Sequence, residues 1–181
     1  MKFQEQSSTD MQGLATRLQG QRTAMLTLRE SDGLMSARPL TPLEMDVDGH
    51  FWFMVSRSSL AAEFVSGDQD VNLAFSDEGK SLFVSIAGSA RLSDDMTRKV
   101  ALWSAMARPW FSGAEDPDLV LLRVQPRRIE LWDGPNSSVM RALALATSVA
   151  AGRPIGLGER ETLNPAAHPQ STPVVPVSPA L

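Results

Sequence analysis

Short apolar runs separated by tight turns are the feature that most limits how this chain can fold. The runs recur roughly every 10–15 residues with few helical stretches between them, at 23–30, 34–40, 50–56, 71–76, 81–93, 119–125 and 128–133. Two of the turns contain Asp-Gly pairs, at 32–33 and 48–49, and Asp-Gly between apolar runs is a strong hairpin signal. The sequence therefore predicts a mainly β, antiparallel barrel, closed or partly closed, with helices at its ends.

Three residues refine this prediction. Pro39 lacks a backbone N–H, so it marks a strand end or an edge strand. Gly88 indicates a bulge or bend within 81–93. Pro126 separates the last two strands.

Short helices are expected around the strands. Ser-Ser-Thr-Asp at 7–10 can cap a helix that carries Met11, Leu14 and Leu18 on one side. A second helix is expected over 58–66, and an alanine- and leucine-rich helix reaches about residue 151. Asp94 and Asp95 can cap another helix, whose apolar face would carry Met96, Val100, Trp103 and Ala107.

The chain divides into three parts. Residues 1–9 are expected to be a flexible N-terminus, and 10–151 a single domain. Residues 152–181 hold half of the chain's 12 prolines and no amphipathic period. This composition predicts a Pro-rich, disordered tail.

Composition excludes several kinds of site. The chain has no cysteine and two histidines, His50 and His168, without metal-ligand partners at useful spacing. The Asp-Val-Asp-Gly segment at 46–49 fails as a calcium loop, because its twelfth position is Arg57 instead of glutamate. With a net charge of −4, neither nucleic acid nor an anionic membrane is an expected partner. No metal is predicted, and the expected location is the cytoplasm.

Polar residues at the end of the 50–56 strand indicate an anion site. Ser56, Arg57, Ser58 and Ser59 come where a strand ends and a helix begins, and a helix start offers unpaired N–H groups to a phosphate. Arg38 is the second basic candidate, since an arginine between apolar neighbours needs an anion. Helix capping and, for Arg38, a salt bridge to a loop acid remain open alternatives.

Aromatic residues form a third element. Trp103 lies on the apolar helix face, where core packing is the simpler interpretation. Trp110 and Phe111 precede a loop rich in glycine and acidic residues. Two large aromatics in such a place usually cover a planar ligand or a neighbouring subunit.

Several segments together resemble one family. They are MLTLRESDGLMSARPL, GHFWFMVSRSSLAAEF, VNLAFSD, LFVSIAGSARLSDD and ALWSAMARPWFSGAEDPDLVLLRVQPRRIELWD, in collinear order over about residues 10–150. They resemble the general stress protein branch of the pyridoxamine 5′-phosphate oxidase-like, FMN-binding split-barrel proteins. The resemblance implies a Greek-key split barrel of six to seven antiparallel strands, and a homodimer with FMN at the subunit interface.

The same resemblance suggests roles for individual residues. Arg38, Ser56 and Ser59 would hold the flavin phosphate, with Arg57 and Ser58 beside them. Ser36, Pro39 and Val55 would line the ribityl chain and ring, and Phe75 and Ser76 would border the flavin. The partner chain would supply Trp103, Trp110 and Phe111. Leu60 stands where relatives commonly carry a lysine, which leaves FAD as an alternative cofactor.

Function is open between two classes. The first is an FMN-dependent oxidoreductase that acts on a small molecule by hydride transfer at the flavin. The second is a flavin-binding sensor, store or interaction module without turnover. No catalytic side chain is identified, and whether the chain is an enzyme stays uncertain.

Overall fold

The computed structural model describes residues 1–6, 8–60, 64, 67–134, 148–149 and 159–165. The helical elements are α1 (Thr9–Arg17), α2 (Arg57–Leu60), α3 (Met96–Leu102) and the 3-10 helix η1 (Ala105–Ala107). The strands are β1 (Lys2–Phe3), β2 (Ala24–Arg29), β3 (Met35–Leu40), β4 (Glu44–Met45), β5 (Phe51–Ser56), β6 (Gln69–Asp77), β7 (Leu82–Ser93), β8 (Leu119–Asp133) and β9 (Glu159–Leu163).

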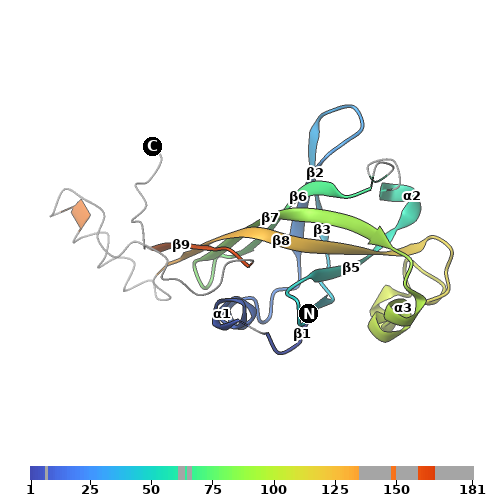
Figure 1. Ribbon diagram of the computed structural model, residues 1–181, viewed down its shortest axis with the longest axis horizontal. Helices are drawn as coiled ribbons and strands as arrows, with labels where there is room; N and C mark the ends of the chain where they lie inside the picture. Colours follow the sequence, from blue (N-terminus) through green and yellow to red (C-terminus); the bar gives the residue numbers. More distant parts are fainter. Residues whose placement is uncertain (7, 61–63, 65–66, 135–147, 150–158, 166–181) are drawn as a thin grey trace.

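The described strands form one sheet in the order β1-β4-β5-β8-β7-β6-β2-β3, with β9 paired to β8. All described pairings are antiparallel except β1 with β4. β7 and β8 run as a long pair through the middle of the molecule, with α3 near one end and β9 at the other (Figure 1). The predicted mainly β, antiparallel class is confirmed. The described strands number nine where six to seven were expected, because β1, β4 and β9 are short and lack an apolar alternation.

The sheet curls around its core. Two strands lie between β5 and β6 in the sheet order, so a flat sheet would hold them roughly 14 Å apart. Instead the rings of Phe51 in β5 and Phe75 in β6 have centroids 5.9 Å apart. One core cluster draws buried side chains from α1 and from the strands, for example Leu14, Leu26 and Leu122. A barrel-like arrangement follows from this shared interior.

Most of the turn and cap predictions are confirmed. Gly33 and Gly49 adopt positive φ values of 89° and 78° in the β2–β3 and β4–β5 turns. β3, which contains Pro39, is an edge strand of the described sheet. Ser8 caps α1 and Asp95 caps α3 through their side chains.

Pro126 does not break a strand, so the prediction of two separate strands is wrong. β8 continues through it, because the register against β7 shifts there: Ala87 pairs with Arg128, whereas Gly88 pairs with Pro126. Gly88 is needed at this point, as predicted for a bulge. A Cβ on Gly88 would lie 2.1 Å from the Gln125 carbonyl oxygen.

The predicted apolar face of α3 is also wrong. Met96 and Val100 are exposed, whereas Lys99 and Leu102 are the buried residues of this helix. Leu102 joins a small cluster with Trp52 and Leu121. The i, i+4 spacing identified apolar residues correctly, but contact with the sheet is made by another side of the helix.

Three further predictions concern the less regular parts. α2 is helical over 57–60, Phe64 lies in a turn, and the remainder of the expected 58–66 helix lies outside the described residues. Most of the helix expected up to residue 151 also lies outside them. The tail prediction does not hold for β9, where Leu163 is buried and the backbone pairs with β8; five residues rich in charge gave no apolar alternation to reveal it.

Candidate functional site

A cavity of about 420 Å³ lies between the edge strand β3, the end of β5, α2 and the segment after α3. Its lining residues are Arg38, Pro39, Leu40, Thr41, Leu43, Met54, Val55, Ser56, Ser59, Leu60, Ser104, Met106, Ala107, Trp110 and Phe111. Arg38 and the 56–59 bend thus share one hollow, as the phosphate hypothesis requires. Arg38 is the only ionisable side chain among these lining residues.

Arg38 projects from β3 toward the 56–59 bend. Its Nη1 donates to the Ser59 carbonyl oxygen at 3.1 Å, and its Nη2 donates to Glu30 Oε1 at 3.1 Å. A longer contact of 3.4 Å joins Nη2 to Ser36 Oγ. Arg38 therefore forms the salt bridge to a loop acid that was its alternative interpretation, and it also lines the cavity.

The position expected for an anion at the start of α2 is taken by the chain's own carboxylate. Ser56 Oγ donates to Asp118 Oδ2 at 2.6 Å, and the Ser58 backbone N–H donates to Asp118 Oδ1 at 2.9 Å. The hydrogen bond from the Ser56 hydroxyl, followed by that from the Ser58 backbone, holds the pKa of Asp118 below its ordinary range. Asp118 itself is fixed by the turn before β8, where its N–H donates to Asp116.

The three serine hydroxyls all donate to other groups of the chain. Ser59 Oγ donates to the Ser56 carbonyl oxygen at 2.8 Å, and Ser56 Oγ lies 2.8 Å from Ser58 Oγ. Since a hydroxyl has one hydrogen and that of Ser56 goes to Asp118, Ser58 is the donor in this pair. These hydroxyls therefore present lone pairs, and a phosphate, which only accepts hydrogen bonds, gains little from them in this arrangement.

Arg57 points away from the cavity. Its guanidinium pairs with Asp94, which also accepts from Lys99 at 3.0 Å. The hydrogen bond from Arg57 is the main reason why the pKa of Asp94 lies below its ordinary range. Arg57 is accordingly a link between α2 and the start of α3 and does not line the cavity.

The structure brings together about half of the sequence-predicted site residues. The cavity is lined by Arg38, Pro39, Val55, Ser56, Ser59, Trp110 and Phe111. Outside the lining are Ser36, Arg57, Ser58, Phe75, Ser76 and Trp103. Phe75 is core, at 2% exposure, Ser76 is exposed on β6, and Trp103 ends α3 half-buried.

The two aromatics after η1 lie beside the other candidates of their own chain. The resemblance implied that the partner chain would supply them to the site. In this structure they line the cavity of their own chain, the one that contains Arg38. Trp110 is 75% exposed and Phe111 only 8%. Phe111 therefore belongs to the wall and Trp110 to the rim.

Sequence reasoning missed other residues of this site. Met54 adds to the apolar wall, and its apolar character within the 50–56 strand was the only signal for it. Asp118 belongs to the loop rich in glycine and acidic residues after Phe111, for which no site role was predicted. Its role depends on β8 pairing with β5, where Leu119 lies opposite Ser56, and that long-range pairing leaves no local signal.

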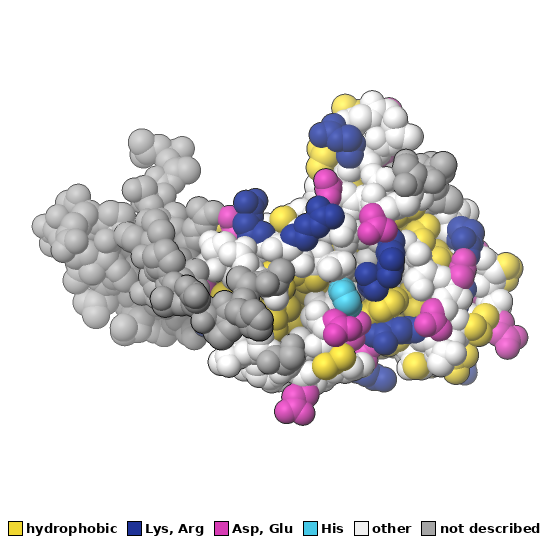
Figure 2. Space-filling view, in the orientation of Figure 1, with side chains coloured by type: hydrophobic (Ala, Val, Ile, Leu, Met, Phe, Trp, Pro, Cys, Tyr) yellow, Lys and Arg dark blue, Asp and Glu magenta, His cyan; other side chains and the backbone are white. Residues whose placement is uncertain are grey.

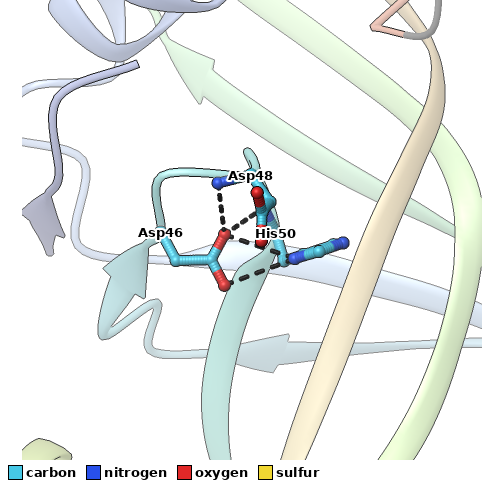
Figure 3. A group of neighbouring side chains, drawn as sticks. All are labelled: Asp46, Asp48 and His50. Carbon is cyan, nitrogen blue, oxygen red and sulfur yellow. Dashed lines mark hydrogen bonds and ion pairs between the residues drawn. The ribbon is translucent and has the colours of Figure 1, made fainter. Parts of the chain in front are cut away.

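Asp46, Asp48 and His50 form a compact group between β4 and β5 (Figure 3). Their potential ligand atoms lie within 4.8 Å of one another. Asp46 nevertheless accepts hydrogen bonds from the backbones of Asp48 and His50, from Trp52 Nε1 at 2.7 Å and from Arg98. Burial opposes ionisation of Asp46, but hydrogen bonds from Trp52 and His50 outweigh it and lower the pKa. This group is a hydrogen-bonded turn, and we assign no metal to it.

Comparisons with family models, curated proteins and solved structures all find pyridoxamine 5′-phosphate oxidase-like or general stress proteins. A family model described as pyridoxamine 5′-phosphate oxidase like matches residues 9–155. General stress protein 26 of Bacillus subtilis (strain 168) is 32% identical over 81 residues, which cover 43% of this chain and 58% of that protein. The chain therefore matches little more than half the length of this curated relative.

Solved structures cover more of the chain. General stress protein 26 from Jannaschia sp. CCS1 is 26% identical, with a TM-score of 0.69 over 87% of this chain and 99% of that chain. The general stress FMN/FAD binding protein from Xanthomonas citri is 32% identical, with a TM-score of 0.61 over 72% of this chain and 93% of that chain.

Among the described residues, no helix has the length and apolar character that crossing a bilayer requires.

Proposed function

Because this chain belongs to the pyridoxamine 5′-phosphate oxidase-like family, we propose that its cavity binds a flavin, with FMN as the first candidate and FAD as the alternative. The observation that carries the proposal is the cavity itself, which joins the Arg38 guanidinium to an apolar and aromatic wall. Its volume of about 420 Å³ falls in the range of small-molecule sites. The Xanthomonas citri protein, described as FMN/FAD binding, supports the choice of ligand.

The two ends of the cavity would contact different parts of the flavin. Arg38 would hold the phosphate, since a guanidinium forms strong charge-assisted hydrogen bonds to phosphate oxygens. Pro39, Val55 and Phe111 would contact the ring system. Leu60 is 1% exposed and lines the cavity, so it adds apolar surface and no charge to the phosphate end.

A bound flavin would supply hydride transfer, and the protein would supply position and electrostatics. Arg38 is the only ionisable side chain among the described lining residues, so these residues include no carboxylate, histidine or lysine that could serve as a general acid or base. This observation favours the second candidate function, a flavin-binding module without turnover. Anaerobic reduction of the bound flavin by NAD(P)H, followed by reoxidation with an acceptor, would favour the oxidoreductase.

We also propose a cytoplasmic homodimer. Exposed apolar side chains follow α3 and η1 to the cavity rim, namely Met96, Val100, Met106 and Trp110. A second chain would cover this surface and close the cavity mouth, since contiguous exposed apolar surface usually marks an interface. Light scattering that reports a monomer would contradict this part of the proposal.

The flavin proposal is tested by titrating the protein with FMN and riboflavin, followed by flavin absorbance and tryptophan fluorescence. Arg38→Ala removes a charged hydrogen-bonding partner worth about 1.5–3 kcal/mol. Because Arg38 also pairs with Glu30, we expect the lower end of this range, a roughly tenfold weaker FMN affinity. Riboflavin lacks the phosphate, so its affinity should change little. Arg22→Ala, at an exposed position, is the matched control. Equal losses for both flavins would exclude Arg38 as the phosphate ligand, and no binding by the wild-type protein would refute the proposal.

A further inference from the structure

Two arginines face each other on neighbouring strands away from the cavity. Arg91 of β7 pairs in register with Arg123 of β8. Directly paired residues point to the same side of a sheet with Cβ atoms roughly 4.5–5.5 Å apart, and like charges in this position are destabilising. Neither residue lines the flavin cavity. The pair therefore needs its own explanation.

Arg123 has no counter-ion among the described residues. Its Nε is buried without a hydrogen-bond partner, and no described carboxylate lies within ion-pair distance of its guanidinium. Burial, and then the charge of Arg91, lower the pKa of Arg123. The buried Nε of this half-buried side chain has lost water without gaining an acceptor, which is unfavourable.

The acids whose charges act on Arg123 are Asp46, Asp68 and Asp48. Trp52 pairs with Arg123 on the other side, in β5, and the Arg98 guanidinium lies 4.1 Å above the Trp52 ring. Arg98 in turn binds Asp46 and Glu44. Acidic and basic side chains meet beside the histidine on this face (Figure 2). Asp46 and Glu44 thus neutralise Arg98, and Asp46, Asp68 and Asp48 attract Arg123 only from a distance.

We propose that Arg91 and Arg123 bind an oxyanion, specifically the phosphate group of a small molecule. Two adjacent guanidinium groups offer the paired donors that phosphate oxygens accept. A phosphate held by the terminal nitrogens of both guanidinium groups would relieve the repulsion between the two side chains. General basicity does not explain the pair, because the chain carries a net charge of −4.

The test measures the melting temperature of the protein against inorganic phosphate and glycerol phosphate, with ionic strength held constant by sodium chloride. The Arg38→Ala background removes the candidate flavin-phosphate ligand, so the outcome does not depend on the proposed function. We expect a saturable rise in melting temperature in this background. Arg91→Gln and Arg123→Gln should raise the phosphate concentration at half-saturation about tenfold or more, whereas the exposed control Arg22→Gln should leave it unchanged. A stronger response to glycerol phosphate than to inorganic phosphate would identify a phosphorylated metabolite as the ligand.

A second expectation separates binding from a structural role. Without phosphate, Arg91→Gln should raise the melting temperature, because it removes a like charge opposite Arg123. If Arg123→Gln does not fold, Arg91→Gln alone decides, since Arg91 is exposed. A wild-type protein that responds to neither phosphate, as an internal counter-ion would cause, overturns the proposal. So does an unchanged response in Arg91→Gln.

Discussion

Trp110 and Phe111 are adjacent in the chain, line the same cavity and differ in burial, so they separate ligand binding from folding. Trp110 is 75% exposed and Phe111 is 8% exposed. Trp110→Ala should therefore leave the folded chain nearly as stable as the wild type. Phe111→Ala removes a buried ring, which typically costs about 3–5 kcal/mol of folding free energy.

The effect of Trp110→Ala on binding follows from its exposed area. A tryptophan side chain presents roughly 200 Å², of which about three quarters are free here. Covering all of this area at about 25 cal/mol per Å² would contribute nearly 4 kcal/mol. If the flavin and a second chain cover half of it, the contribution is about 2 kcal/mol, which is a roughly 30-fold change in dissociation constant.

The assay pairs urea unfolding of the flavin-free protein with FMN titration, for both variants. Light scattering at each titration concentration separates loss of dimer from loss of flavin contact. The reasoning is refuted if Trp110→Ala lowers the free energy of unfolding as much as Phe111→Ala. It is refuted equally if Trp110→Ala leaves both the FMN affinity and the oligomeric state unchanged.

Three other substitutions test the site and its supporting sheet. Gly88→Ala should lower the free energy of unfolding by about 3 kcal/mol or more, because its Cβ would clash with the Gln125 carbonyl oxygen. The control Gly113→Ala should be nearly neutral. Equal urea midpoints for the two variants would contradict this prediction. Asp118→Asn should make the free energy of unfolding depend less on pH in the acid range. A carboxylate whose pKa is lowered in the folded state stabilises the protein above its ordinary pKa of 3.8 and loses this contribution as the pH falls through the folded-state pKa. An unchanged midpoint of acid unfolding would count against the capping role. Glu30→Gln frees Arg38 from an ion pair and should strengthen FMN binding roughly two- to fivefold with riboflavin unaffected; weaker FMN binding would mean that Glu30 orients Arg38 for the ligand.

Local signals in the sequence were sufficient for the turns, caps and edge. Asp-Gly turns require positive φ, which glycine adopts without a steric penalty, and Gly33 and Gly49 do so. A proline in β3 is compatible only with a strand that leaves that position unpaired on one side. Asp95 caps α3 by accepting from the Arg98 N–H. Each of these effects involves residues close together in the chain.

Features that depend on distant pairing were missed. Pro126 looked like a strand break because the shifted register that accommodates it arises from β7, which precedes β8 by many residues. The face of α3 was misassigned because Leu102 packs against Trp52 and Leu121, which lie in two other strands. Asp118 reaches the 56–59 bend only through the pairing of β5 with β8. The positions of the candidate residues were therefore largely predictable, and their partners were not.

Those partners change which ligand groups can bind at the end of the cavity that we propose for the phosphate. A bend with three free hydroxyls and two arginines would bind a dianion strongly. In the folded chain the hydroxyls donate internally, Arg57 belongs to Asp94 and Leu60 adds no charge. Arg38 is left as the cation for the ligand, and it is shared with Glu30. The preference for FMN over riboflavin should therefore be set by the difference between two ion pairs of Arg38, one with phosphate and one with a carboxylate. Such a difference is smaller than either interaction alone, so much of the affinity for the proposed flavin would come from the ring and from the aromatic rim.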